Sequence, residues 1–258
     1  MHLRQTITFV AYISSPYNYD PSSISKNIMK TIGLIGGMSW ESSAMYYRTI
    51  NELVKQRLGG LHSARVILYS VDFAEIEAMQ AHGEWQQAGQ VLAQAAASLQ
   101  AAGADFLLLC TNTMHKVAAQ IEAAVSIPLL HIADPTAKAI KQAGLQKIAL
   151  LGTRFTMEQE FYRGRLQALH GIEVLLPDEQ ERADVHRIIY DELCLGVLTT
   201  KSRSCYRDVM AGLMERGAQG IILGCTEISL LVTPQDAKLP LFDTTALHAA
   251  SAVDMALA

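Results

Sequence analysis

Short apolar runs alternate with longer amphipathic stretches along most of the chain. The runs lack the polar alternation of a half-exposed strand and are therefore typical of strands buried on both faces, while the stretches between them have helical periodicity. Helices alternating with such strands predict an α/β fold with parallel sheets covered on both faces. We expect strands at residues 31–35, 65–71, 105–110, 129–132, 148–151, 173–176, 221–223 and 239–242, with helices such as 41–58 and 158–169 between them.

One pattern occurs twice in the chain. Residues 103–113 read GADFLLLCTNT and residues 217–227 read GAQGIILGCTE, and the two segments align without a gap, so that Thr111 matches Cys225. The repeat is too long for a solenoid, and it predicts two duplicated Rossmann-like lobes with parallel sheets, related by a pseudo-two-fold axis. We expect a ligand site in the cleft between the lobes, because ligands of open α/β sheets bind beyond the carboxyl ends of the strands.

The predicted lobes have unequal boundaries. The first comprises residues 29–137 together with residues 237–258, and the second comprises residues 138–236. The tail is assigned to the first lobe because the second half already has a full set of strands and helices. Residues 1–28 have no periodicity and many turn residues, so we expect a disordered extension, with Met29 as an alternative start of the protein.

The composition is that of a soluble globular protein. The chain has 258 residues, of which 50% are hydrophobic, and a formal net charge of −4. This charge offers no basic surface for nucleic acid or an anionic membrane, and no apolar run approaches the roughly 20 residues of a membrane span. The four cysteines lack C-x-x-C spacing. We therefore expect a cytoplasmic protein with reduced thiols and without nucleic-acid or membrane partners.

Thr111 and Cys225 are the candidate catalytic residues, because each follows a predicted buried strand and precedes a helix. A cysteine before a helix N-terminus is placed to have its pKa lowered from about 8.5, which makes its thiolate a good base. Two such groups on opposite sides of one carbon suit a racemase without a cofactor, since one removes the α-proton and the other returns a proton to the opposite face. The alternative is that these polar residues are only helix caps.

Three motifs carry a resemblance to a known family. From Met29 onward the chain resembles the aspartate/glutamate racemase family through GGMS at residues 36–39, CTNTMH at 110–115 and GCTE at 224–227. The resemblance implies two α/β lobes, an amino acid as the small-molecule substrate, no pyridoxal phosphate or other cofactor, no metal, and a homodimer. It also implies two cysteines as the bases of α-proton transfer.

The first of those two cysteines is replaced in this chain. Thr111 stands in its place, while Cys110 lies one position earlier and should point to the opposite face of a regular strand. A threonine hydroxyl ionises much less readily than a thiol, so we expect Cys225 to be the only strong base. In the family the second cysteine acts on the L-enantiomer. We therefore expect deprotonation of L-amino acids to be favoured over that of D-amino acids, with Cys110 as second base the alternative.

The resemblance also implies a set of substrate-binding residues. They flank the two bases or match contact positions of the family, and they are Met38, Gln80, Asn112, Thr113, Thr226 and Glu227. Cys194 stands where some aspartate racemases carry a lysine, which weakens the expectation of a strict preference for acidic substrates. Aspartate and glutamate are expected first, with homoserine and other polar amino acids close behind. Three histidines lack the spacing of metal ligands and fit capping or packing roles: His115, His131 and His248.

Two other functions fit part of this pattern. A decarboxylase or cis–trans isomerase of small diacids needs a single cysteine, which Cys225 supplies. A non-catalytic amino-acid sensor would keep the cleft and lose turnover. Exchange of the α-proton with solvent separates these functions from racemisation, because a racemase places solvent deuterium on Cα of the recovered amino acid.

Overall fold

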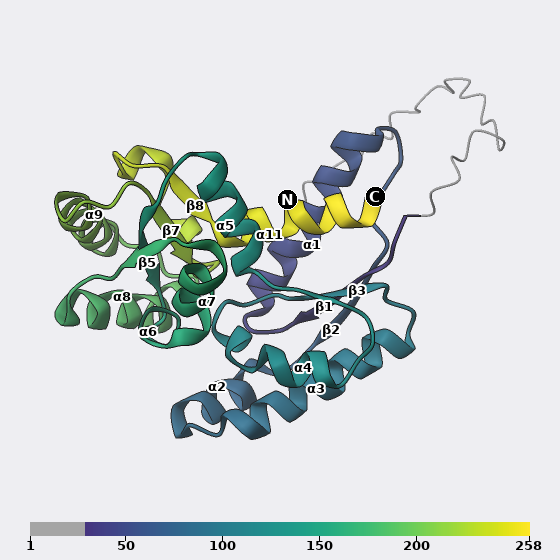
Figure 1. Ribbon diagram of the computed structural model, residues 1–258. Helices are drawn as coiled ribbons and strands as arrows, with labels where there is room; N and C mark the ends of the chain where they lie inside the picture. Colours follow the sequence, from purple (N-terminus) through teal and green to yellow (C-terminus); the bar gives the residue numbers. More distant parts are fainter. Residues whose placement is uncertain (1–28) are drawn as a thin grey trace, which may run out of the picture.

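The computed structural model describes residues 29–258, which form two four-stranded parallel sheets (Figure 1). The strand order is β2-β1-β3-β4 in the first sheet and β6-β5-β7-β8 in the second, so the two sheets have the same topology. The duplicated two-lobe α/β fold predicted from the sequence is therefore confirmed. The strands are β1 (Ile32–Gly36), β2 (Val66–Ser70), β3 (Phe106–Leu109), β4 (Leu129–Leu130), β5 (Lys147–Gly152), β6 (Glu173–Leu175), β7 (Ile221–Gly224) and β8 (Leu241–Asp243).

Helices or short helical turns connect the strands. The first half contains α1 (Trp40–Leu58), α2 (Phe73–His82), α3 (Trp85–Ala101), the 3-10 turn η2 (Thr113–Val117), α4 (Ala118–Ala123) and α5 (Ala133–Gln142). The second half contains α6 (Arg154–Glu158), α7 (Glu160–His170), α8 (Glu179–Asp191), the turn η3 (Leu193–Leu195), α9 (Thr200–Glu215), α10 (Ile228–Leu231), the turn η4 (Pro234–Asp236) and α11 (Thr244–Leu257). Among residues 29–258, no helix combines the length and apolar character needed to span a bilayer.

Alternate residues of β3 pack on opposite sides of the first sheet. Leu107 and Leu109 belong to the core formed with α3, whereas Phe106 and Leu108 belong to the core formed with α1 and α11. All four side chains are fully buried, as expected for a strand that is covered on both faces. Cys110 continues the Phe106 and Leu108 series and lies in the same core, so its side chain points away from the α3 side of the sheet.

The C-terminal tail divides between the two sheets, which corrects its predicted assignment to the first lobe. β8 pairs with β7, so the tail's strand belongs to the second sheet. α11 then packs against α1, where Ala249 and Val253 share a core with Tyr46 and Ile50. Figure 1 shows α11 (yellow) reaching from the second lobe to α1. The rest of the domain division stays a prediction, although its boundary at residue 138 falls inside α5.

Two local elements differ from their predicted form. The helix expected at residues 158–169 is α7, which begins at Glu160. A short helix that the sequence pattern does not predict, α6, precedes it, and the extended backbone of Gln159 separates the two. The helix after the TNT segment begins as the 3-10 turn η2, which continues into α4. The expected extension at residues 1–28 lies outside the described residues.

Candidate active site

A small cavity lies between the two lobes, next to the carboxyl ends of β3 and β7. About 400 Å³ of space there is free of protein atoms, including the part open to solvent, and the centre of a water molecule can reach about 30 Å³ of it. All the catalytic and substrate-binding residues proposed from the sequence lie on this cavity. Its lining comprises Met38, Phe73, Gln80, Thr111, Asn112 and Thr113 from the first half, and Thr153, Ile189, Tyr190, Cys194, Gly224, Cys225, Thr226 and Glu227 from the second.

Cys225 follows β7 directly and is hydrogen-bonded to the carboxylate of Glu227. Its thiol donates to Oε2 of Glu227 at 2.9 Å. The other carboxylate oxygen accepts a hydrogen bond of 2.9 Å from the hydroxyl of Ser39. Ser39 also caps α1 by accepting from the backbone N–H of Ser42, so the first lobe fixes the carboxylate that contacts the thiol of the second lobe.

The pKa of Cys225 is raised well above its ordinary value, first by burial and then by the negative charge of Glu227. The lowered pKa predicted from the helix N-terminus is therefore wrong. Two features explain the difference: α10 spans only Ile228–Leu231 and begins beyond the cysteine, so its dipole is small, and a like charge lies within hydrogen-bond distance. The thiol of Cys225 consequently keeps its proton at neutral pH in this structure.

Thr111 lies on the cavity at the end of β3, in a turn fixed by its backbone. Its N–H donates to the carbonyl of Leu109 at 2.8 Å, and its carbonyl accepts from Nδ1 of His115 at 2.8 Å. Cys110, the alternative second base, is fully buried and does not line the cavity. Burial raises the pKa of Cys110 strongly. The predicted alternation at the strand end is therefore confirmed, and the structure brings Thr111 to the cavity in place of Cys110.

The substrate-binding candidates form polar contacts between the lobes. Oγ1 of Thr113 lies 2.9 Å from Oγ1 of Thr153, and Oγ1 of Thr226 lies 2.8 Å from Oγ of Ser42. The Nδ2 group of Asn112 donates to Thr244 at 3.0 Å. The other amide atom, Oδ1 of Asn112, is buried and has no hydrogen-bond partner among the described residues. A buried acceptor without a partner is available to a donor group of a ligand.

Gln80 lies at the cavity between the two lobes. Its side chain is buried, its Nε2 donates to Sδ of Met114 at 3.0 Å, and its Oε1 accepts from the hydroxyl of Tyr190 at 3.1 Å. The sequence argument missed Tyr190 and Thr153 as cavity residues. Thr153 ends the segment KIALLGT, whose likeness to the first strand-and-loop segment could have identified it, whereas Tyr190 belongs to a helix whose sequence contains no such signal.

The cavity has little positive charge. Glu227 is its acidic residue, and no lysine or arginine of residues 29–258 lines it. Cys194, which stands where a basic residue was considered, does lie on the cavity. Burial raises the pKa of Cys194 to about 12, with a further contribution from the charge of Glu227. A ligand carboxylate in this cavity must therefore be held by hydroxyl, amide and backbone N–H groups.

Comparison with known proteins agrees with this geometry. The family model described as Asp/Glu/Hydantoin racemase matches residues 35–252. The chain is 25% identical over 235 residues to the broad specificity amino-acid racemase RacX of Bacillus subtilis (strain 168), and the alignment covers 88% of this chain and 98% of RacX.

Two crystal structures are also similar. One is a candidate Asp/Glu racemase from Yersinia pestis, with a TM-score of 0.84 and 63% identity, covering 89% of this chain and 100% of that chain. The other is PH1733, an aspartate racemase homologue from Pyrococcus horikoshii OT3, with a TM-score of 0.77 and 33% identity, covering 88% of this chain and 99% of that chain. The chain therefore belongs to the Asp/Glu/Hydantoin racemase family and is an isomerase, an amino-acid racemase.

Proposed function

We propose that this racemase needs no pyridoxal phosphate and interconverts L- and D-amino acids by two-base transfer of the α-proton. Cys225 removes the proton from the L-enantiomer, and Thr111 delivers a proton to the opposite face of Cα. One observation carries this proposal: Thr111 and Cys225 follow the matching strands β3 and β7 of two sheets with the same strand order, and both line one cavity.

Glu227 is the group that takes the proton of the Cys225 thiol. The 2.9 Å hydrogen bond already points the thiol proton at the carboxylate, and Ser39 holds that carboxylate in place. The transfer leaves the net charge of the buried pair unchanged, so it avoids creating an additional charge in a poorly solvated site. The thiolate formed is a strong base, because burial raises the pKa of its conjugate thiol.

In the proposed reaction, a proton leaves one face of Cα and another proton arrives at the opposite face. The Cα–H bond breaks, its proton goes to the sulfur of Cys225, and its electron pair moves into the substrate carboxylate. The hydroxyl of Thr111 gives its proton to the other face of Cα, and a solvent water restores that hydroxyl. The hydroxide formed from this water takes the proton that Glu227 received from Cys225, which returns the site to its starting state. Because a threonine hydroxyl is a weak base, removal of a proton by Thr111 is the harder direction.

The polar groups of the cavity support amino-acid binding. The buried Oδ1 of Asn112 is an acceptor for the substrate ammonium, and the turns after β3 and β7 supply N–H groups for the substrate carboxylate. Since no lysine or arginine of the described chain lines the cavity, an acidic side chain gains no ion pair there. Membership of the Asp/Glu/Hydantoin racemase family is what makes aspartate and glutamate the first substrates to test, and the uncharged lining places homoserine and other polar amino acids beside them.

The test is exchange in D2O with the L- and D-forms of aspartate, glutamate and homoserine. The wild-type enzyme is expected to yield the opposite enantiomer with deuterium at Cα, and Cys225→Ala is expected to yield none. Thr111→Ala removes one base only, so it should still exchange the α-proton of the L-form while failing to racemise it. Exchange from the D-form by Thr111→Ala, or its unchanged racemisation, would contradict the assigned roles.

Absence of exchange with every amino acid would overturn the racemase mechanism, and small dicarboxylates would then be tested for decarboxylation or isomerisation.

The proposal also includes a homodimer located in the cytoplasm. Light scattering on the purified protein measures the oligomeric state, and a mass of one chain would contradict the dimer.

A further inference from the structure

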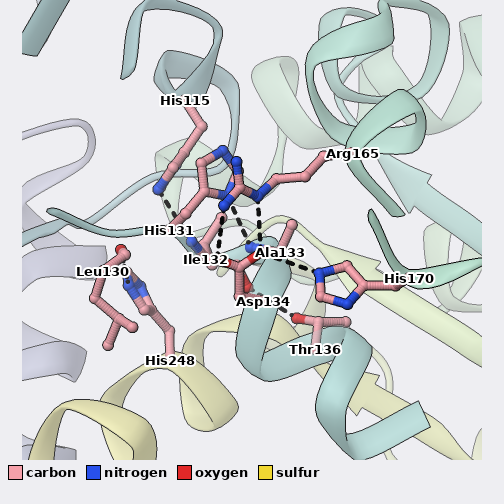
Figure 2. A network of polar contacts seen from close by, with 10 residues as sticks. All are labelled: His115, Leu130, His131, Ile132, Ala133, Asp134, Thr136, Arg165, His170 and His248. Atoms are coloured by element: carbon pink, nitrogen blue, oxygen red, sulfur yellow. Dashed lines mark hydrogen bonds and ion pairs between the residues drawn. The ribbon is translucent and has the colours of Figure 1, made fainter. Parts of the chain in front are cut away.

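A buried group of three histidines lies behind Thr111, on the side away from the cavity lining. His115, His131 and His248 come from η2, the segment after β4, and α11, and at most 6% of each is exposed. The ring centroids of His115 and His131 are 4.5 Å apart, and those of His115 and His248 are 6.0 Å apart (Figure 2). The proposed proton transfer uses none of the three.

The hydrogen bonds of His115 fix its tautomer. Nδ1 lies 2.8 Å from the carbonyl oxygen of Thr111, and a carbonyl can only accept, so Nδ1 carries the proton. Nε2 accepts from the backbone N–H of Ile132 at 3.2 Å, so it carries none. Burial, together with the nearby His131 and His248, lowers the pKa of His115 well below its ordinary value, which keeps the ring neutral. The ring therefore connects the turn of Thr111 to the segment between β4 and α5.

That segment is in turn anchored to the second half of the chain. Asp134, in the first turn of α5, accepts two hydrogen bonds of 2.7 Å from Arg165. His170 lies 3.2 Å from the same carboxylate. Arg165 and His170 both belong to α7, and Figure 2 shows them meeting Asp134 directly beyond Ile132. The carbonyl of Thr111 is thus held, through one imidazole, by a segment fixed by both lobes.

Simple packing and metal binding explain this arrangement less well. A packing role would be met by any apolar ring and would not orient both ring nitrogens toward backbone partners. As for a metal, residues 29–258 contain no group of three histidine, cysteine or acidic side chains arranged to hold one. Both nitrogens of His115 are already occupied by the backbone.

We propose that His115 is a positioning residue for Thr111. By holding the Thr111 carbonyl, the ring sets the direction of the next bonds of the turn, and so places the Thr111 hydroxyl over the face of Cα opposite Cys225. Loss of this hydrogen bond slows reprotonation from the Thr111 side and leaves proton removal by Cys225 intact. The intermediate then returns more often to the L-form. This inference rests on the roles proposed above for Thr111 and Cys225.

Three substitutions isolate the hydrogen bond to Thr111. His115→Asn can place an N–H group near the position of Nδ1 and restore the hydrogen bond to the Thr111 carbonyl. His115→Gln can form only the hydrogen bond with the N–H of Ile132, and His115→Leu can form neither bond. The readout is a ratio measured with α-deuterated L-substrate in ordinary water: L-substrate that has lost its deuterium, divided by D-product. A general loss of folded enzyme lowers both quantities together and leaves the ratio unchanged.

We expect His115→Gln and His115→Leu to raise this ratio about fivefold or more, the factor that corresponds to one net hydrogen bond, and His115→Asn to stay within about twofold of wild type. His248→Leu is the matched control, because His248 is equally buried but bonds to Leu130 and Tyr46 instead of Thr111. It should lower the melting temperature without changing the ratio.

Failure of the positioning role of His115 and failure of the proposed function give different results in this experiment. A wild-type enzyme that racemises while His115→Gln leaves the ratio unchanged overturns the positioning role and leaves the proposed function standing. An equal rise in His115→Asn and His115→Gln also overturns it, because the Thr111 bond would then not be the cause. If His115→Leu fails to fold, the comparison of the asparagine and glutamine variants decides. Absence of racemisation in the wild type overturns the proposed function itself.

Discussion

The thiol of Cys225 donates its hydrogen bond to a carboxylate, that of Glu227, across 2.9 Å. A base paired with an anion is harder to ionise, and the raised pKa of Cys225 agrees with this. In the proposed mechanism the same contact supplies the acceptor for the thiol proton, and Cys225 becomes a base when that proton moves to Glu227.

Glu227→Gln should make the Cys225 thiol easier to ionise and the enzyme slower. The amide keeps the shape of the carboxylate but removes its charge, so the pKa of Cys225 should fall by about one unit. Racemisation should fall by about 100-fold, because the proton acceptor is lost. Alkylation by iodoacetamide as a function of pH measures the first effect, with Cys225→Ala identifying the signal of this thiol. An alkylation profile that does not move to lower pH would contradict the pairing.

Cys110→Ala should leave racemisation unchanged while lowering the stability. Cys110 is fully buried away from the cavity, and truncation of its side chain should cost about 1–2 kcal/mol of unfolding free energy. Urea unfolding and initial racemisation rates measure the two effects. Loss of activity in excess of the loss of folded protein would instead support Cys110 as the second base.

Thr111→Cys is expected to speed proton removal from D-amino acids, the direction in which residue 111 acts as the base. A thiol ionises more readily than a hydroxyl, so removal of the α-proton from D-amino acids should become faster than in the wild type. Solvent deuterium in recovered D-substrate measures this step, and Thr111→Ser serves as the control that keeps a hydroxyl. Equal D-exchange in the cysteine and serine variants would show that acidity at this position does not limit the reaction.

Cys194→Lys should shift the preference toward acidic amino acids. A lysine on the cavity offers a substrate side-chain carboxylate an ion pair, which should lower the KM for aspartate relative to homoserine about tenfold. Cys194→Met has a long side chain without charge and should leave this ratio near the wild-type value. A similar change in both variants would attribute the effect to side-chain size.

The buried imidazoles predict a stability that falls on the acid side of neutrality. Burial lowers the pKa of His131 to about 3 and that of His248 to about 4. An unfolded histidine titrates near 6.5, so between about pH 4 and 6.5 the unfolded chain binds more protons than the folded one. Stability should be complete above this window and should fall with decreasing pH, by up to about 1.4 kcal/mol per pH unit for each histidine.

Urea unfolding between pH 4.5 and 7.5 measures this dependence, and His131→Asn should reduce its slope by the share of one group. A slope that is the same with and without His131 would show that this imidazole is not held neutral by the fold.

Most of the fold could be predicted from the sequence because the central strands β1, β3 and β7 are apolar and buried, and because the repeat is long. The assignment of the whole tail to the first lobe is wrong because β8 pairs with the free edge of β7. The number of strands and helices predicted for each half does not reveal which sheet edge is free. Helix α6 is missing from the prediction because its five residues are too few for helical periodicity to be recognised in the sequence.

The positions of the site residues could also be predicted, since strand ends and strand alternation placed Thr111 on the cavity and Cys110 in the core. The ionisation of Cys225 could not be predicted in this way. It depends on a carboxylate two residues away whose direction is set by Ser39 from the other lobe. Likewise, the link from His115 to Thr111 requires knowledge of the tautomer, which only the backbone partners define.

The matching ends of β3 and β7 carry different residues, Thr111 and Cys225, but this difference cannot make the enzyme accumulate one enantiomer. Two enantiomers have the same free energy in water, so their mixture ends with equal amounts of each whatever groups the enzyme contains. The ratio kcat/KM must therefore be the same for the L- and D-forms. In steady-state racemisation, an advantage of Cys225 over Thr111 shows as a higher kcat that is matched by a higher KM for the L-form, whereas isotope exchange measures each proton removal separately. The asymmetry of the site thus governs which enantiomer saturates the enzyme first, while the final mixture remains racemic.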